Sequence, residues 1–313
     1  MENECLDRVL EIFYRLLHGE VVPNRLIAEE YGISSKSVSR DIGRINDFLA
    51  EHRDLMQNAE VTYSHKDRAY ILKSDEFLKN QELFALVKVI LGARCFSKED
   101  MLSVVSKLKK FTTANDRKLL DEVIRREIYH YHEVRSDCDS VIDNLWRLVQ
   151  CIDGKKVISV TYLKMDRSEV VRKLKPAAIM FSEYYFYLAA FIEGIDKKEH
   201  FKNPQDNSPT IYRIDRIQNC KTLDRHFAQR YANRFQEGEM RKRIQFMYGG
   251  ELQTICFEYT GPSLESVLDR LPTAKVLQVT EKGWIVEAEV FGTGIQMWIR
   301  SQGDYVNVIS EIP

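Results

Sequence analysis

The sequence lacks the features that mark membrane, secreted and disulfide-bonded proteins. No window of about 18 uninterrupted apolar residues occurs, so we expect no membrane-spanning segment and no membrane partner. The six cysteines are scattered, without a Cys-x-x-Cys pair or a histidine at ligand spacing, which predicts reduced thiols rather than disulfides or zinc. The opening residues, MENECLDRVLEIF, have no basic region of the kind that begins a signal peptide. These absences together predict a cytoplasmic protein.

Catalytic signatures are missing as well. The chain has no G-x-S-x-G, H-E-x-x-H, Walker A or dinucleotide glycine motif, and its glycine turns GGELQ and FGTGIQ are weak as phosphate loops. The segment YHYHEV could suggest a metal ion, but His130 and His132 would face different sides of the helix expected there. An enzyme is the alternative function class, and the missing motifs count against it. We therefore predict no catalytic residues, no metal and no cofactor.

Net charge is also small. The formal charge is -1 for 313 residues, so no overall basic field indicates a nucleic-acid partner, and any such contact must come from local basic residues. One local excess lies between Lys155 and Arg225, where nine lysines and five arginines face nine acidic residues, a net charge of +5. A chain of this length is expected to contain two or three domains, because single cores rarely exceed about 250–300 residues.

The first 75 residues contain the pattern of a DNA-binding domain. Apolar residues recur at helical spacing from Leu6 to Leu17, and a second helix is predicted from Asn24 to Tyr31. Ser34 then follows a glycine turn as the N-cap of a third helix. Strand-like alternation around His65-Lys66-Asp67 predicts a β-hairpin. Helix, helix-turn-helix and hairpin is the order of a winged helix.

The predicted third helix has two different faces. Its buried stripe comprises Val38, Ile42, Ile45 and Leu49. A recognition helix needs short donors near its N-terminus for base edges and long cations for phosphates. The predicted DNA-binding residues are Ser35, Lys36, Ser37 and Arg40 for base edges, Arg44 for phosphate, and Lys66 and Arg68 at the hairpin tip. The alternative is a solvated helix face, on which Arg40 pairs with a nearby acid such as Asp41.

The rest of the chain predicts an α+β multidomain fold. Residues 76–150 have helical periodicity and form a helical linker, and from Lys155 the period changes to two, as expected for four or five antiparallel strands in a small bent sheet. The last region has the order βαββαβ, the ferredoxin-like plan. The predicted domains are residues 1–75, 76–150, 151–228 and 229–313.

An aromatic strand and an arginine-bearing strand lie about twenty residues apart, in EYYFYLAAFI and IYRIDRI. Alternate residues of a strand share a face, so Tyr185 and Tyr187 point together, whereas Arg213 and Arg216 do so only if a bend intervenes. One interpretation is core rings and ordinary salt bridges, with Asp215 as the partner. The other is a groove that binds phosphate through arginine and bases through tyrosine. Its candidate ligand-binding residues are Tyr162, Tyr185, Tyr187, Arg213 and Arg216.

These segments resemble a known family. EYYFYLAAF followed by YRIDRIQNCKTL is similar to the signature of WYL domains, with Phe186-Tyr187-Leu188 where the family has Trp-Tyr-Leu, and Pro176 stands where the family usually has proline. MWIRSQGDYVNVISEIP resembles the C-terminal extension of these proteins, and LIAEEYGISSKSVSRDIGRINDFL resembles their winged helix-turn-helix. The resemblance covers nearly the whole chain in the family's order.

The resemblance implies a bacterial or phage-related transcription regulator. Such a protein is usually a homodimer, paired through its C-terminal parts, and binds a double-stranded DNA operator that we expect to be an inverted repeat. Its WYL domain would bind a negatively charged ligand, either a nucleotide or a single-stranded oligonucleotide. The alternative is a nucleic-acid-binding accessory protein of a defence system, without operator binding. Phe186 in place of tryptophan leaves the strand intact and removes an indole N–H.

Overall fold

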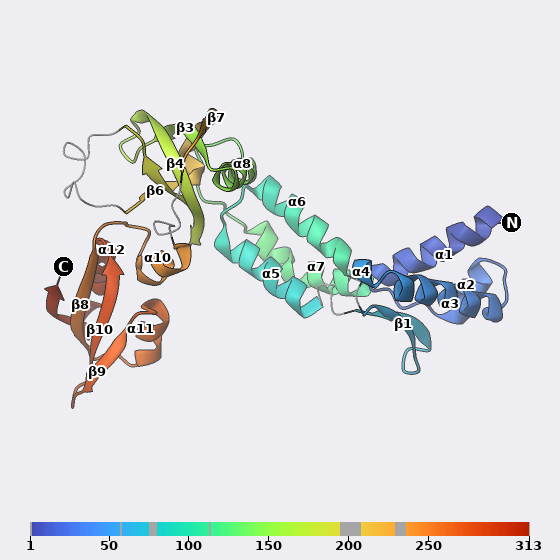
Figure 1. Cartoon of the computed structure of the whole chain (residues 1–313). Coiled ribbons are helices and arrows are strands. Elements are labelled where there is room, and N and C mark those ends of the chain that lie inside the picture. The colour runs from blue at the N-terminus through green and yellow to red at the C-terminus, as the bar shows by residue number, and fades with distance from the viewer. Residues whose placement is uncertain are drawn as a thin grey trace. The chain divides into compact units, whose positions relative to one another are not determined.

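The computed structural model describes residues 2–56, 58–74, 80–112, 114–194, 208–228 and 236–312. The chain combines helices with antiparallel sheets, so the α+β class is confirmed (Figure 1). It divides into two compact units, Met1–Glu133 and Val134–Pro313. No helix among the described residues is long and apolar enough to cross a membrane.

The first unit begins with helices followed by a two-stranded hairpin, in the order that the sequence predicts. The bounds are α1 (Glu2–Leu17), α2 (Asn24–Glu30), α3 (Ser35–Glu51), α4 (Arg53–Met56), β1 (Glu60–Ser64) and β2 (Ala69–Lys73). The Ser34 hydroxyl accepts a hydrogen bond from the Ser37 backbone N–H at 3.1 Å, so the predicted N-cap of α3 is confirmed. The two strands pair up to Ser64 and Ala69, which leaves residues 65–68 as the loop at the hairpin tip.

The predicted apolar stripe of α3 holds this part together. Val38, Ile42, Ile45 and Leu49 are at most 4% exposed and pack with residues of α1, α2 and β1. Burying one such aliphatic side chain stabilises the fold by about 1.5–3 kcal/mol. Since an isolated helix of this length is marginal in water, this packing determines which face of α3 remains in solvent.

The first unit continues with a second group of helices, which has its own core. The bounds are α5 (Asn80–Ala93), α6 (Lys98–Leu108), the 3-10 turn η1 (Lys109–Phe111) and α7 (Ala114–Tyr129). Leu83, Met101 and Ile124, one from each long helix, are at most 1% exposed. Because α7 ends at Tyr129, the expectation that His130 and His132 lie on a helix is wrong.

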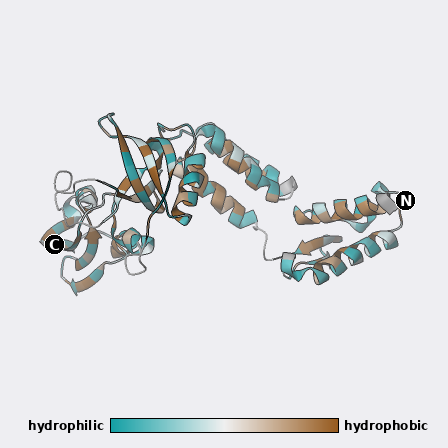
Figure 2. Ribbon diagram, turned by 45° about the horizontal axis from the view of Figure 1, so that its top comes forward, coloured by the Kyte–Doolittle hydropathy of each residue, from teal (hydrophilic) through white to brown (hydrophobic). Residues whose placement is uncertain are grey.

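The second unit begins with a helix and a five-stranded antiparallel sheet in the order β6-β5-β4-β3-β7. The bounds are α8 (Val141–Asp153), β3 (Lys156–Leu163), β4 (Glu169–Ser182), β5 (Tyr185–Ile192), β6 (Thr210–Arg213), the 3-10 turn η2 (Ile214–Arg216) and β7 (Ile217–His226). Hydrophobic and hydrophilic residues alternate along these strands, as Figure 2 shows. Leu148 and Cys151 of α8 pack into the core of this sheet.

The chain ends with a second, four-stranded antiparallel sheet in the order β11-β8-β10-β9. The bounds are α10 (Glu237–Arg243), β8 (Leu252–Tyr259), α11 (Leu264–Arg270), β9 (Lys275–Val279), β10 (Trp284–Phe291), α12 (Gly294–Ser301), the 3-10 turn η4 (Gly303–Tyr305) and β11 (Val306–Ile312). From β8 onward this is the βαββαβ element order expected from the sequence. Phe257 and Trp298 pack edge to face in its core, with ring centroids 5.7 Å apart.

The division into four domains stays a prediction. The boundaries after residues 75 and 228 fall at segments outside the described residues, 75–79 and 229–235. The boundary after residue 150 falls inside α8, which packs against the five-stranded sheet. This helix therefore shares the core of the sheet, although the sequence-based division assigned most of it to the helical segment before the sheet.

Candidate functional site

The outward face of α3 carries exposed cations opposite its buried stripe. Lys36 and Arg40 are exposed, and neither has an ion-pair partner among residues 2–56 and 58–74. Ser35 is exposed as well, whereas Ser37 is half-buried and donates its backbone N–H to the Ser34 hydroxyl. The four side chains predicted to read base edges thus lie on the first turns of one helix.

Asp41 determines which arginine of α3 remains unpaired and able to contact DNA. Its carboxylate is 1% exposed and accepts hydrogen bonds from Arg8 Nε at 2.7 Å and from Arg44 Nη1 at 3.4 Å. The hydrogen bond to Asp41 raises the pKa of the Arg8 guanidinium above its ordinary value. Arg44 also donates to Cys5 Sγ of α1 at 2.9 Å. The carboxylate next to Arg40 is therefore occupied by other arginines, and the phosphate role of Arg44 stays a prediction.

The hairpin tip presents the two predicted wing residues to solvent. Lys66 and Arg68 are both exposed in the loop between β1 and β2. Arg68 has a φ of 51°, in the left-handed region, and the loop is closed by a 2.6 Å hydrogen bond from the Ser64 hydroxyl to Asp67. Their contacts with DNA stay predictions.

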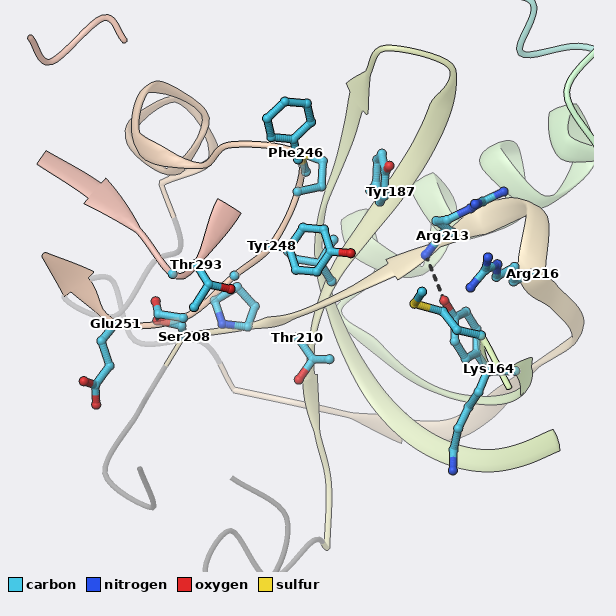
Figure 3. A pocket seen from close by; sticks show the side chains of 18 of the residues that line it. Lys164, Tyr187, Ser208, Thr210, Arg213, Arg216, Phe246, Tyr248, Glu251 and Thr293 are labelled. Atoms are coloured by element: carbon cyan, nitrogen blue, oxygen red, sulfur yellow. Dashed lines mark hydrogen bonds between the residues drawn. The ribbon is translucent and has the colours of Figure 1, made fainter. Parts of the chain in front are cut away.

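A cavity of about 1140 Å³ lies in the second unit, between the five-stranded sheet and the C-terminal region (Figure 3). The sheet side supplies residues from the ends of β3 and β5 and from the β6–η2 segment. The other side consists of the segment 246–253 and the turn at residues 292–293. Cavities of 300–1,000 Å³ hold small-molecule ligands, so this one has room for such a ligand.

Four of the five predicted ligand residues line this cavity: Tyr162, Tyr187, Arg213 and Arg216. Both arginines line the cavity because the 3-10 turn η2, which follows Arg213 and ends at Arg216, supplies the bend that strand parity requires. Tyr185 does not line the cavity. Its ring lies under the Arg213 guanidinium, with the central carbon of that group 3.4 Å from the ring centroid.

Arg213 is fixed in place by its neighbours. Its Nε and Nη2 donate to the two oxygens of Asp215 at 3.1 and 2.6 Å, and Asp215 is 5% exposed. Burial acts to lower the pKa of Arg213, but the hydrogen bonds and charge of Asp215 outweigh it, so the pKa is raised. The Arg213 backbone N–H donates to the Tyr162 hydroxyl at 3.3 Å. Arg213 thus forms the salt bridge that the first interpretation expects. The edge of its guanidinium that could donate two parallel hydrogen bonds to a phosphate is occupied by Asp215.

Arg216 is the more available cation of the cavity. It is half-buried and has no ion-pair partner within the part of the chain that the structure describes. Lys164, which follows β3, is exposed on the same cavity and was missed by the sequence reasoning. A guanidinium and an ammonium that form no close ion pair with the described residues can bind an anion through charge-assisted hydrogen bonds.

Tyr162 and Tyr187, the two tyrosines on the sheet side of the cavity, remain neutral phenols at ordinary pH. Burial raises the pKa of Tyr187 to about 12 and raises that of Tyr162 above its ordinary value. Tyr187 contacts the apolar cluster of Ala178, Met180 and Met247 on one side and the cavity on the other. A neutral phenol offers both an O–H donor and an aromatic surface to a ligand.

The C-terminal wall of the cavity was not predicted from the sequence. It contains Tyr248, Gly249 and Gly250 from GGELQ and its preceding residue, and Gly292 and Thr293 from FGTGIQ. A Cβ on Gly250 would lie 2.7 Å from Gly292 Cα, and the Gly292 N–H donates to the Glu251 carbonyl at 2.9 Å. The two glycine turns therefore pack backbone against backbone. Both turns are visible in the sequence, but their contact is not.

The part of the chain that the structure describes brings together no metal site. Among the described residues, no group of three or more His, Cys, Asp or Glu side chains is placed to hold a metal ion. The His130 ring contacts Tyr129 edge to face, and Glu133 accepts a hydrogen bond from the Lys98 backbone N–H. The six cysteines are free thiols.

The comparisons with known proteins concern the second unit most directly. Residues 143–222 match the family model of the WYL domain. Among solved structures, the chain is similar to proteasome accessory factor B/C (PafBC) of Arthrobacter aurescens, with 14% sequence identity and a TM-score of 0.31. The matched region covers 98% of this chain and 45% of the PafBC chain. The chain is also similar to a CRISPR Cas-related protein, with 15% sequence identity and a TM-score of 0.36. This match covers 76% of this chain and 70% of the other.

No curated protein matches the chain. The chain spans less than half the length of the PafBC chain to which it is similar. The matched range begins within α8 and ends within β7, and it includes the sheet side of the cavity. Residues 143–222 of this protein therefore form a WYL domain.

Proposed function

We propose that this protein is a sequence-specific DNA-binding transcription regulator, and that its WYL domain binds a negatively charged ligand that modulates DNA binding. In this proposal residues 1–75 form a winged helix-turn-helix and residues 229–313 a ferredoxin-like domain. The observation that carries it is the outward face of α3, where Lys36 and Arg40 are exposed without ion-pair partners in the described part of their domain. The protein is proposed to be no enzyme and to act in the cytoplasm.

The geometry of α3 supports contact with the major groove. An α-helix fits this groove when one side of it is free of neighbours, and here the other side is sealed by four buried aliphatic residues. Arginine and lysine are the usual donors to guanine, and Lys36 and Arg40 lie one turn apart. Lys66 and Arg68 at the hairpin tip would add phosphate contacts beside the helix.

The cavity of the WYL domain supports binding of an anion. Arg216 and Lys164 provide charge, and Tyr162 and Tyr187 provide neutral phenols on the same wall. A phosphate group meets these requirements because it accepts several charge-assisted hydrogen bonds at once. Arg213 would shape this wall rather than hold the phosphate in a fork, since its bidentate edge is occupied by Asp215. The ligand would be a nucleotide or a short single-stranded oligonucleotide.

The regulator is proposed to work as a homodimer on an inverted repeat. One winged helix covers little DNA, and two copies related by a twofold axis would read two half-sites one or more helical turns apart. The ligand would change DNA affinity only as far as it prefers one arrangement of the dimer over another.

Selection from a randomised library of DNA duplexes tests the proposal. The purified protein should enrich one sequence with twofold symmetry over successive rounds, and light scattering should give twice the 36.7 kDa of the chain. Retention of all duplexes without enrichment would favour a nucleic-acid-binding accessory protein instead. Retention of no DNA would overturn the proposal.

A further inference from the structure

The segment that joins α10 to β8 has an unusual backbone. Phe246 and Met247 are consecutive and have φ angles of 49° and 58°, in the left-handed region. Non-glycine residues seldom adopt this conformation because it is strained, so it persists only where the surroundings enforce it. Residues held in this way are enriched at ligand-binding sites.

The strained pair sends three consecutive side chains to three different places. Phe246 stacks against Arg270, with 4.7 Å between the guanidinium carbon and the ring centroid. Met247 is 8% exposed and packs with Met180 and Ala189 of the five-stranded sheet. Tyr248 is 45% exposed and lines the cavity. Figure 3 shows its ring projecting from the C-terminal wall toward the wall that carries Arg213 and Tyr187.

Both ends of this segment are anchored. Ile244 and Met247 belong to the apolar cluster that joins the sheet to the C-terminal region. Beyond Tyr248, Gly249 and Gly250 pack against Gly292 so closely that a Cβ on Gly292 would lie 2.3 Å from the Gly249 carbonyl oxygen. The Tyr248 ring is therefore a large exposed aromatic group on a fixed support, not the tip of a free loop.

We propose that Tyr248 is a ligand-stacking residue supplied by the C-terminal region, and that it binds a nucleobase whose phosphate contacts Arg216 and Lys164. This inference rests on the proposed function of the cavity and adds to it a residue outside the WYL domain. The base lies on the Tyr248 ring, with Tyr187 on the opposite wall. A bound nucleotide then contacts both the sheet and the C-terminal region, so its binding energy holds the two together.

Two labelled probes separate the stacking contact from the charge contact. The first is a single-stranded tetranucleotide of thymidine, and the second is an abasic tetranucleotide with the same phosphates. Fluorescence anisotropy measures the affinity of the full-length protein for each. Tyr248→Ala should weaken binding of the thymidine probe about 5- to 150-fold, which corresponds to about 1–3 kcal/mol for one stacked base. Binding of the abasic probe should change less than twofold. Tyr248→Phe, which keeps the aromatic surface, should bind as the unchanged protein does.

The matched control is Tyr305→Ala, since Tyr305 is 52% exposed in the same region and does not line the cavity. It should leave both affinities unchanged. If Tyr248→Ala binds the thymidine probe as tightly as the unchanged protein, while Arg216→Ala binds it weakly, Tyr248 is not a ligand residue and the proposed function stands. If the unchanged protein binds neither probe, the proposed function of the cavity fails and the inference fails with it.

Discussion

The face of α3 and the cavity of the WYL domain are both rich in cations, but they are built differently. On α3 the side chains come from one helix, and their direction follows from the helical period and one apolar stripe. The cavity is assembled from segments up to about 130 residues apart, between Tyr162 and Thr293. A site of the first kind depends on local sequence, and a site of the second kind depends on long-range packing.

The two sites also differ in whether their cations are paired with carboxylates. Lys36 and Arg40 on α3 are exposed without ion-pair partners in the described part of their domain. In the cavity, Arg213 is held by a nearly buried carboxylate and by the Tyr185 ring, and Arg216 is the more available arginine. A cation that is already paired orders its surroundings, whereas an unpaired one can bind a partner.

The largest effect is expected where the cavity wall depends on glycine. Gly292→Ala places a Cβ 2.3 Å from a carbonyl oxygen at a φ of 63°, so backbone strain and overpacking add. We expect the free energy of unfolding of the second unit to fall by about 4 kcal/mol in urea denaturation. Gly303→Ala has a similar φ of 58° and open space around it, and should cost only about 1 kcal/mol. Equal losses for both variants would mean that the contact between the glycine turns is unimportant.

A smaller loss is expected where α3 depends on a contact with another helix, the ion pair between Asp41 and Arg8 of α1. Arg8→Met removes the closer partner of the Asp41 carboxylate, which is 1% exposed. Leaving a buried charge short of a partner should lower the free energy of unfolding of the first unit by about 3 kcal/mol. Adding Asp41→Asn should restore part of this loss. Arg25→Ala, which breaks an exposed pair with Glu29, should leave the free energy of unfolding nearly unchanged, because water screens an exposed ion pair.

Arg216, the arginine of the cavity that forms no ion pair with the described residues, is expected to contribute to ligand affinity. Arg216→Ala should weaken binding of a single-stranded oligonucleotide by about 2 kcal/mol without changing stability, because Arg216 has no described carboxylate partner. Calorimetry measures the affinity, and Lys173→Ala is the control, since Lys173 is an exposed cation of β4 outside the cavity. If Lys173→Ala weakens binding as much as Arg216→Ala does, the sheet attracts nucleic acid through its overall charge instead.

The smallest effect concerns the local signal that starts α3. Ser34→Ala removes the oxygen that accepts the Ser37 N–H, and should lower the free energy of unfolding of the first unit by about 1 kcal/mol. Ser34→Asp should retain the cap and most of the stability. A stability equal to that of the unchanged protein in the alanine variant would show that tertiary packing alone fixes the start of this helix.

The outcome of the sequence predictions follows the same division between local and long-range structure. The N-cap at Ser34, the stripe of α3 and the hairpin between residues 60 and 73 were predictable, because each depends on residues close in sequence. The bend between Arg213 and Arg216 was left open, since a single 3-10 turn has no strong sequence signal. The C-terminal wall was missed because the contact between Gly250 and Gly292 depends on how two strands of the last sheet are placed.

The most direct test of the proposed function is the specificity ratio of the double variant Lys36→Ala/Arg40→Ala. Fluorescence anisotropy would give its affinity, and that of the unchanged protein, for the selected duplex and for an unrelated duplex at one salt concentration. If α3 reads bases, each substitution costs about 1–3 kcal/mol on the selected duplex and less on the unrelated one, so the ratio falls at least tenfold. Arg53→Ala, an exposed arginine of α4, should leave the ratio unchanged. A double variant that keeps both its affinity and its ratio would contradict DNA recognition by α3.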